Sequence, residues 1–174
     1  MTEIKKNFNL PELGRRIEEL VNASGPLWDI VYTRVQAALD QIEEQVAVRT
    51  PVGATGNLRG GWGTVPLQLH GVGVMYGQVV NPMSYGPVVE EGRQPGTMPP
   101  ITPGLKLWVK RVLGVPDKDV DSVSFAVAKK IEARGTKPAR MLDEGWRAAF
   151  PVIDQQMSAM LTEIVAELGD SIMQ

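Results

Sequence analysis

The middle of the chain, residues 51–103, concentrates residues that shape a backbone and is nearly empty of residues that do chemistry. It holds 11 of the 18 glycines and 8 of the 13 prolines of the 174-residue sequence. Its charged side chains are Arg59, Glu90, Glu91 and Arg93. Glycine and proline set turns, bulges and loop shapes, and they neither transfer a proton nor attack an electrophile. The pattern indicates a protein shaped for assembly and predicts that it is not an enzyme.

The composition of the whole chain narrows the class of protein further. The net charge is −2, with acidic and basic residues interleaved, so no broad positive field favours specific binding to nucleic acid. The absence of cysteine excludes disulfides and thiolate metal sites, and one histidine leaves little for a metal cluster. No apolar run approaches the roughly 18–20 residues of a membrane span, and the N-terminus lacks an apolar signal core. We expect no cofactor, no membrane partner and synthesis in a cytoplasm.

Hydrophobic spacing predicts a long helix near the N-terminus. Apolar residues recur at intervals of three and four over residues 26–48, and the helix should stop at Thr50, because a residue that precedes proline is pushed out of the α region. A shorter helix over 8–21 is a weaker prediction, since it contains a proline and a glycine. We treat residues 1–24 as an N-terminal arm and residues 25–174 as a single domain.

The C-terminal half is predicted to be helical. Thr102 as N-cap and Pro103 at the first helical position predict a helix that carries Trp108 on its apolar stripe. A second helix is expected over residues 120–131, ended by a glycine. From residue 138 onward apolar residues keep near-heptad spacing, with Pro151 as a kink or break. That stripe is longer than a small sheet requires, so it either packs in the core or contacts a neighbouring subunit.

Alternating residues in the middle of the chain predict three strands, over 58–69, 71–81 and 84–90. Gly56 is expected to adopt a positive φ in the turn before them, so Gly56→Val should destabilise more than Gly145→Ala. The fold class is therefore α+β: a small curved antiparallel β-sheet packed against a long N-terminal helix, with a helical C-terminal half.

Several residues permit a chemical interpretation beside a structural one. His70 could act as a base for a hydrolase, but it lies at an expected hairpin tip, where an exposed turn histidine is the simpler interpretation. Glu90 and Glu91 could form a carboxylate pair, although neighbours on a strand point to opposite faces. The segment Arg59-Gly-Gly-Trp62 is similar to RNA-binding RGG segments, yet a single copy inside an expected strand favours structure.

Several segments, taken in order, resemble the tail-component proteins of long-tailed bacteriophages. They are Thr50-Pro-Val, a spacer, Thr55-Gly-Asn-Leu-Arg59, a strand pair, Tyr85-Gly before Val89-Glu-Glu-Gly, a Pro-Gly and Pro-Pro loop, a Trp-bearing helix over 105–112, and Gly135-Thr-Lys-Pro before the last helix. The resemblance covers roughly residues 45–150. The chain departs from the pattern at Pro138-Ala-Arg-Met-Leu, where the family is expected to be more aromatic, which affects the docking of the last helix.

The resemblance implies a structural virion protein of the phage neck, at the head-tail junction. Tail-completion proteins of this kind join the tail tube to the head-side connector. Such a protein forms a homo-oligomeric ring, a hexamer being one such ring, with a monomer before assembly as an alternative. It would be made in the cytoplasm of the bacterial host, from a phage or prophage gene, and end in the virion. Other minor tail or head-closure roles, and a nucleic-acid-binding module, are the alternatives.

Two groups of residues follow as candidates for this role. We expect the proline-rich loop over 92–103 to bind a partner at low entropic cost, with a mobile surface connection as the alternative. Together with one helix face it would supply the two patches of a ring interface. The predicted interface residues are Arg93, Gln94, Pro95, Gly96, Thr97 and Met98. The predicted structural residues are Gly56, Leu58 and Tyr85, from the resemblance, and Trp108, expected in the core.

Overall fold

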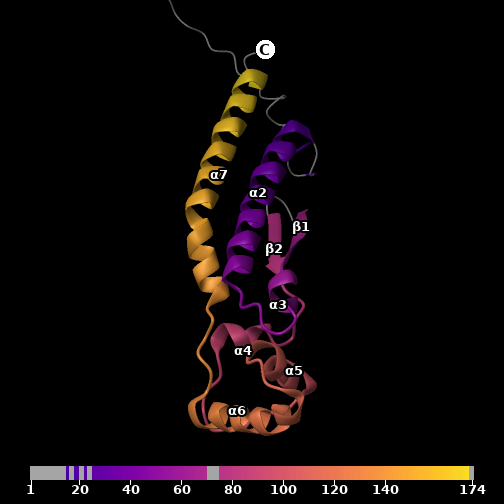
Figure 1. Cartoon of the computed structure of the whole chain (residues 1–174). Helices are drawn as coiled ribbons and strands as arrows, with labels where there is room; N and C mark the ends of the chain where they lie inside the picture. The colour runs from indigo at the N-terminus through magenta and orange to yellow at the C-terminus, as the bar shows by residue number, and fades with distance from the viewer. Residues whose placement is uncertain (1–14, 16–17, 20–21, 23–24, 70–74, 173–174) are drawn as a thin grey trace, which may run out of the picture. The chain divides into compact units, whose positions relative to one another are not determined.

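The structure, a computed structural model, describes residues 15, 18–19, 22, 25–69 and 75–172 (Figure 1). The helices are α2 (Gly25–Arg49), α3 (Asn57–Gly60), α4 (Gly86–Glu91), α5 (Pro103–Val112), α6 (Val120–Arg134) and α7 (Met141–Ile172), with a 3-10 turn η1 (Asp117–Asp119). The strands are β1 (Gly63–Leu69) and β2 (Met75–Val80), which form a two-stranded antiparallel sheet. The predicted α+β class is confirmed.

The chain divides into two compact units. Unit 1 comprises Met1–Ile42, Thr64–Val79 and Ala149–Gln174, and unit 2 comprises Glu43–Gly63 and Val80–Ala148. Each unit has buried apolar residues of its own. Those of unit 1 include Leu27, Val31, Leu39, Ile42, Leu67 and Ala149, and those of unit 2 include Val46, Leu58, Val109, Ala128 and Met141. No helix in the described part of the chain has the length and apolar character needed to cross a membrane.

In unit 1, α2 lies between the sheet and α7 (Figure 1). On the sheet side, β2 comes so close that a Cβ atom on Gly77 would stand 2.6 Å from Leu39 Cδ1. The Gln36 amide donates to the Thr64 hydroxyl over 3.3 Å, which links α2 to β1. A two-stranded ribbon is marginal alone, so the apolar face of α2 stabilises the sheet.

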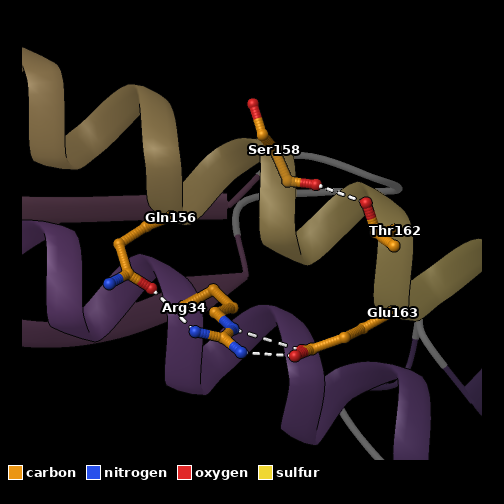
Figure 2. Close-up of polar contacts among 5 residues, drawn as sticks. All are labelled: Arg34, Gln156, Ser158, Thr162 and Glu163. Atoms are coloured by element: carbon orange, nitrogen blue, oxygen red, sulfur yellow. Dashed lines mark hydrogen bonds and ion pairs between the residues drawn. The ribbon is translucent and has the colours of Figure 1, made fainter.

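On its other side, α2 is joined to α7 through Arg34 (Figure 2). The guanidinium donates through Nε and Nη2 to the two carboxylate oxygens of Glu163, the Nε bond measuring 3.1 Å, and through Nη1 to Gln156 Oε1 over 3.0 Å. These bonds lower the pKa of the Glu163 carboxyl, the charge of Arg34 lowers it further, and desolvation opposes both. The same partner raises the pKa of Arg34. A bidentate pair of this kind fixes the register of two helices better than a point contact.

In unit 2, the start of α7 packs tightly on the end of α2. A Cβ atom on Gly145 would stand 2.8 Å from Val46 Cα and 2.9 Å from Val46 N, and Val46 is fully buried. Because backbone atoms yield less than the end of a side chain, Gly145 is not the tolerant position that the sequence suggested. Elsewhere in the unit, α5 packs on α6, and Lys106 is 2.6 Å from Asp121.

The third predicted strand, Ser84 to Glu90, is wrong, because residues 86–91 form α4. Pro87 lacks the N–H that a strand ladder needs and suits the first turn of a helix. The Val89 N–H donates to the Tyr85 carbonyl over 3.1 Å, which is a helical bond. The two adjacent valines suggested a strand through β propensity, and the helical turn overrides that preference.

The other element predictions have mixed outcomes. The long helix over 26–48, the helix that begins at Pro103 and the helix that begins at Val120 are confirmed. The first strand begins at Gly63 rather than Leu58, because residues 57–60 form α3. Pro151 does not break α7, which continues to Ile172. Most of the arm over 1–24, including most of the helix over 8–21, and His70 at the expected hairpin tip lie outside the described residues.

The Gly145 contact predicts opposite effects for two glycines of one helix. Gly145→Ala should lower the free energy of unfolding by about 1–3 kcal/mol, because the new methyl group overpacks against the Val46 backbone. Gly169→Ala should raise it by about 0.5–1 kcal/mol, because that helical position has no neighbouring atom within 4 Å and alanine favours the helix. Urea denaturation of both variants measures the difference, and equal effects would contradict the packing described.

The Arg34–Glu163 pair predicts a pH-dependent contribution to stability. Since the folded-state pKa of Glu163 lies below its ordinary value of 4.5, the pair stabilises fully above that pH and loses its contribution as the pH falls through the lowered folded-state pKa. Glu163→Gln should therefore be less stable than the wild type at neutral pH, and the gap should close in acid. Urea denaturation at neutral and at acidic pH tests this, with Asp154→Asn, at an exposed position on the same helix, as control. A gap that is unchanged in acid would show that the carboxylate charge is not responsible.

Candidate functional site

The loop predicted to bind a partner, residues 92–103, is tied to the end of α6. Arg93 and Thr136 form an antiparallel bridge, with N–H to carbonyl distances of 3.2 and 2.9 Å. The Gly96 N–H donates to the Glu132 carbonyl over 2.7 Å. These backbone bonds give the loop a defined path, so it is better described as a docked loop than as a free connection.

The six residues predicted for the interface differ in exposure. Gln94, Pro95, Gly96 and Thr97 are exposed, whereas Arg93 and Met98 are partly buried. The Arg93 guanidinium donates to the Thr97 carbonyl over 3.2 Å, so it supports the loop as well as facing solvent. The loop tip therefore offers small polar groups and one proline to a partner, without a large apolar anchor.

Unit 2 contains an open apolar pocket of about 560 Å³. Its walls come from the loop after α2 and from α3, α4 and α5, and the lining residues are Pro51, Val52, Gly53, Ala54, Thr55, Asn57, Leu58, Tyr85, Val89, Thr102, Gly104, Leu107 and Trp108. Three of the predicted structural residues, Leu58, Tyr85 and Trp108, are in this lining. The fourth, Gly56, lies in the loop after α2. None of the six predicted interface residues lines the pocket.

Thr50 anchors the loop that forms one wall of the pocket. This residue is fully buried, and its hydroxyl donates to the Val46 carbonyl over 2.7 Å while accepting from Trp62 Nε1 over 2.8 Å. Its own carbonyl accepts from Arg59 Nε over 2.7 Å. Arg59 and Trp62, for which the sequence allowed RNA binding, have a structural role in this fold. Both side chains hold the turn in which α2 ends, and Pro51 then begins the wall of the pocket.

The turn that follows depends on Gly56, whose φ of 74° confirms the predicted left-handed conformation. Such a φ costs a residue with a side chain roughly 1–2 kcal/mol. The turn starts α3 through a bond of 2.9 Å from the Gly60 N–H to the Gly56 carbonyl, and it places Leu58 in the core at 4 % exposure. From the opposite wall, Arg111 Nη1 donates to the Ala54 carbonyl over 3.2 Å.

The opposite wall is the start of α5. Thr102 caps this helix as predicted, since its hydroxyl accepts from the Leu105 N–H over 3.2 Å. Trp108 was expected in the core, but it is partly exposed in the pocket wall, and the fully buried residue is its neighbour Val109. The apolar stripe of an amphipathic helix does not distinguish a residue that fills a core from one that lines an opening.

The pocket suits binding of apolar groups better than acid-base chemistry. Among the described residues that line it, the Tyr85 phenol is the one ionisable group, and none is a carboxylate, an imidazole or an amine. No three acidic or histidine side chains of the described residues gather to hold a metal. General acid-base or nucleophilic catalysis needs such groups within hydrogen-bond reach of the substrate, so this pocket offers no evident chemistry of that type.

Glu90 has a structural role that the sequence did not reveal. Its carboxylate accepts from the Leu142 N–H over 3.0 Å and from the Asp143 N–H over 3.4 Å, so it caps the first turn of α7. Glu91 is exposed on α4 and shares neither bond. The two carboxylates therefore do not act as the pair considered from the sequence. Glu90 and Leu142 are 52 positions apart in the sequence, which explains why no local pattern indicates the cap.

Comparison of the chain with protein-family models, with curated proteins and with solved structures finds no match. The resemblance to phage tail-component proteins therefore stays a prediction, supported by the residues that carry it.

The cap predicts unequal effects for adjacent carboxylates. Glu90→Ala should destabilise by about 0.5–2 kcal/mol, because it removes the acceptor for two helix-start N–H groups and a negative charge at the positive end of a helix. Glu91→Ala, on the exposed face of the same helix, should change stability by less than about 0.5 kcal/mol. Chemical denaturation of the two variants decides, and a larger effect for Glu91→Ala would refute the capping role.

Proposed function

We propose that the chain is a structural protein of the head-tail junction of a long-tailed phage, where copies of it form a ring that joins the tail tube to the head-side connector. The observation that carries the proposal is the pocket of unit 2. Motif segments that are far apart in sequence contribute to its lining: residues 51–55 and 57–58, Tyr85 and Trp108. A family motif whose members gather at one open surface feature is better explained by binding than by core packing alone.

The surface of the described chain supports a role in assembly. Large apolar side chains are exposed at several places, including Trp146 at 51 %, Phe150 at 56 % and Leu161 at 60 %. Single exposed apolar residues are ordinary on monomeric proteins. An open apolar pocket together with exposed aromatic side chains is more typical of a chain that binds other proteins.

A ring places a specific demand on this surface. Each copy must present one patch to the copy before it and a different patch to the copy after it, and the ring closes if the rotation between copies closes. The pocket of unit 2 is one such patch. Its open, largely uncharged lining fits the apolar centre of a protein interface, which is depleted in charged residues.

The proposal predicts a defined assembly defect. Deleting the gene from the encoding phage should give filled heads and separate tails under the electron microscope, with infectivity restored by the wild-type gene in trans. Complementation with Val52→Glu should fail, because it puts a charge into the apolar pocket at a residue that is 52 % exposed. Val48→Glu should restore infectivity, because Val48 is 63 % exposed on α2 and lies outside the pocket lining.

Both variants should fold, since each replaces an exposed residue, and circular dichroism with thermal denaturation confirms that before the particles are scored. Joined, infectious particles in the absence of the gene would contradict the proposed function. If heads and tails join in the presence of Val52→Glu, the pocket is not part of the assembly interface.

A further inference from the structure

The strand β2 has an outer edge with which no described residue pairs. The sheet contains two strands, so β2 is bonded to β1 on one side, and no other backbone bond among the described residues involves Met75–Val80. At the edge of a sheet, every second residue directs its N–H and C=O groups outward. None of the six residues of β2 is fully buried, whereas β1 contains the buried Leu67. The outer edge of β2 is therefore open to a further strand.

The other edge of the sheet is protected against such pairing. The middle residue of β1 is Pro66, which is exposed. A proline is tolerated inside a strand where its missing N–H would face away from the ladder, so the outer edge of β1 lacks a donor at this point. β2 contains neither proline nor lysine, the residues with which proteins commonly protect an edge strand. The sheet thus has one protected edge and one unprotected edge.

The residues of β2 are complementary to a second copy of the same strand. When two copies of the strand run antiparallel and centre on Gln78, Tyr76 of each copy lies opposite Val80 of the other. Tyr76 is 51 % exposed and Val80 is 40 % exposed, and an aromatic side chain opposite a β-branched one is a favourable cross-strand pair. The strand has no charged residue, so self-pairing brings no like charges together.

We propose that β2 pairs with β2 of a second copy of this chain and forms a four-stranded antiparallel sheet. Each copy offers the same edge, so the contact has a two-fold axis, which passes beside Gln78. A two-stranded ribbon is marginal alone, and a sheet of more strands with an apolar face is more stable. β1 then forms both outer edges, where Pro66 opposes the addition of further strands. The pairing therefore stops at a dimer.

The face of the sheet that packs on α2 has room for this arrangement. α2 is bonded to β1 through Gln36 and Thr64 and approaches β2 at Gly77, so it lies across both strands. In the register centred on Gln78, the odd-numbered residues of both copies share one face, which places the two α2 helices on the same side of the sheet. Their axes are then separated by about two strand spacings, roughly 10 Å, which is close to the usual distance between packed helices.

The absence of cysteine from the sequence allows a direct test with the full chain. Q78C places a thiol beside the two-fold axis, where directly opposite residues have Cα atoms about 4.5–5.5 Å apart, a separation that a disulfide can bridge. Q68C is the matched control, because Gln68 is a more exposed glutamine on the neighbouring strand β1. Both variants are oxidised under the same conditions, and non-reducing gels measure the cross-linked dimer.

The proposal predicts a disulfide-linked dimer from Q78C and none from Q68C. A mixture of Y76C and V80C should cross-link as well, whereas either variant alone should not, because residue 76 of one copy lies about 13 Å along the strand from residue 76 of the other. Mass spectrometry identifies the joined peptides. Equal yields from Q78C and Q68C overturn the proposal, since they reflect random collision, and so does the absence of a product from Q78C.

Sedimentation equilibrium adds a measurement that needs no cysteine. The wild-type chain should be a dimer at high protein concentration. Gln78→Lys should be a monomer, because it places two like charges opposite each other, and Gln68→Lys should remain a dimer. Circular dichroism with thermal denaturation checks that both variants fold. A wild-type chain that stays monomeric at every concentration overturns the proposal and leaves the edge for an extended segment of another protein. Dimerisation of Gln78→Lys as strong as that of the wild type also overturns it.

The inference does not rest on the proposed function, and the outcomes keep the two apart. Val52→Glu changes the pocket of unit 2 and should leave the β2 dimer intact. Loss of the dimer in Val52→Glu but not in Gln78→Lys would show that the pocket joins the copies, which overturns this inference and not the proposed function. If Q78C cross-links but phage particles assemble normally without the gene, the β2 contact stands and the proposed function is wrong.

Discussion

The buried threonine at the end of α2 is the point on which the pocket depends. The Thr50 hydroxyl has one proton to donate and accepts one bond, and it uses both, toward the Val46 carbonyl and the Trp62 indole. The carbonyl of the same residue accepts from Arg59. Because Pro51 follows, the helix ends here and the chain turns into the wall of the pocket. In a fully buried site an unsatisfied hydroxyl or carbonyl would be costly, so these three bonds fix the turn closely.

Residues that start or stop a helix explain which elements could be predicted from the sequence. The helix beginning at Pro103 has a capping threonine whose bond the structure contains, and the stop at Thr50 follows from the proline after it. The wrong strand prediction over residues 84–90 has a local cause too. The β-branched residues favour a strand, but the proline among them lacks the N–H that a strand ladder needs. By contrast, the tight approach at Gly145 and the cap from Glu90 involve partners about a hundred and about fifty residues away in sequence. Periodicity within a short window carries no information about such partners.

The sequence predicts which kinds of residue form the candidate site, but not where in the fold they gather. The sequence predicts structural roles for Leu58, Tyr85 and Trp108, and the structure brings them together around one opening. The predicted interface loop, from Arg93 to Met98, lies outside that opening and is docked by backbone bonds to α6 and Thr136. Composition identifies residues that fit a partner surface, whereas the convergence of separate loops on one pocket depends on the tertiary packing of unit 2.

Apolar surface of the described chain is exposed at an open pocket in unit 2 and along α7. The open pocket of unit 2 is the patch through which we propose that identical copies associate in a series. Electron cryomicroscopy of intact particles of the encoding phage tests this most directly. We predict a ring of this chain between head and tail, with the pocket of unit 2 at the contact between neighbouring copies. Particles that lack the chain, or that contain it away from the junction, would contradict the account.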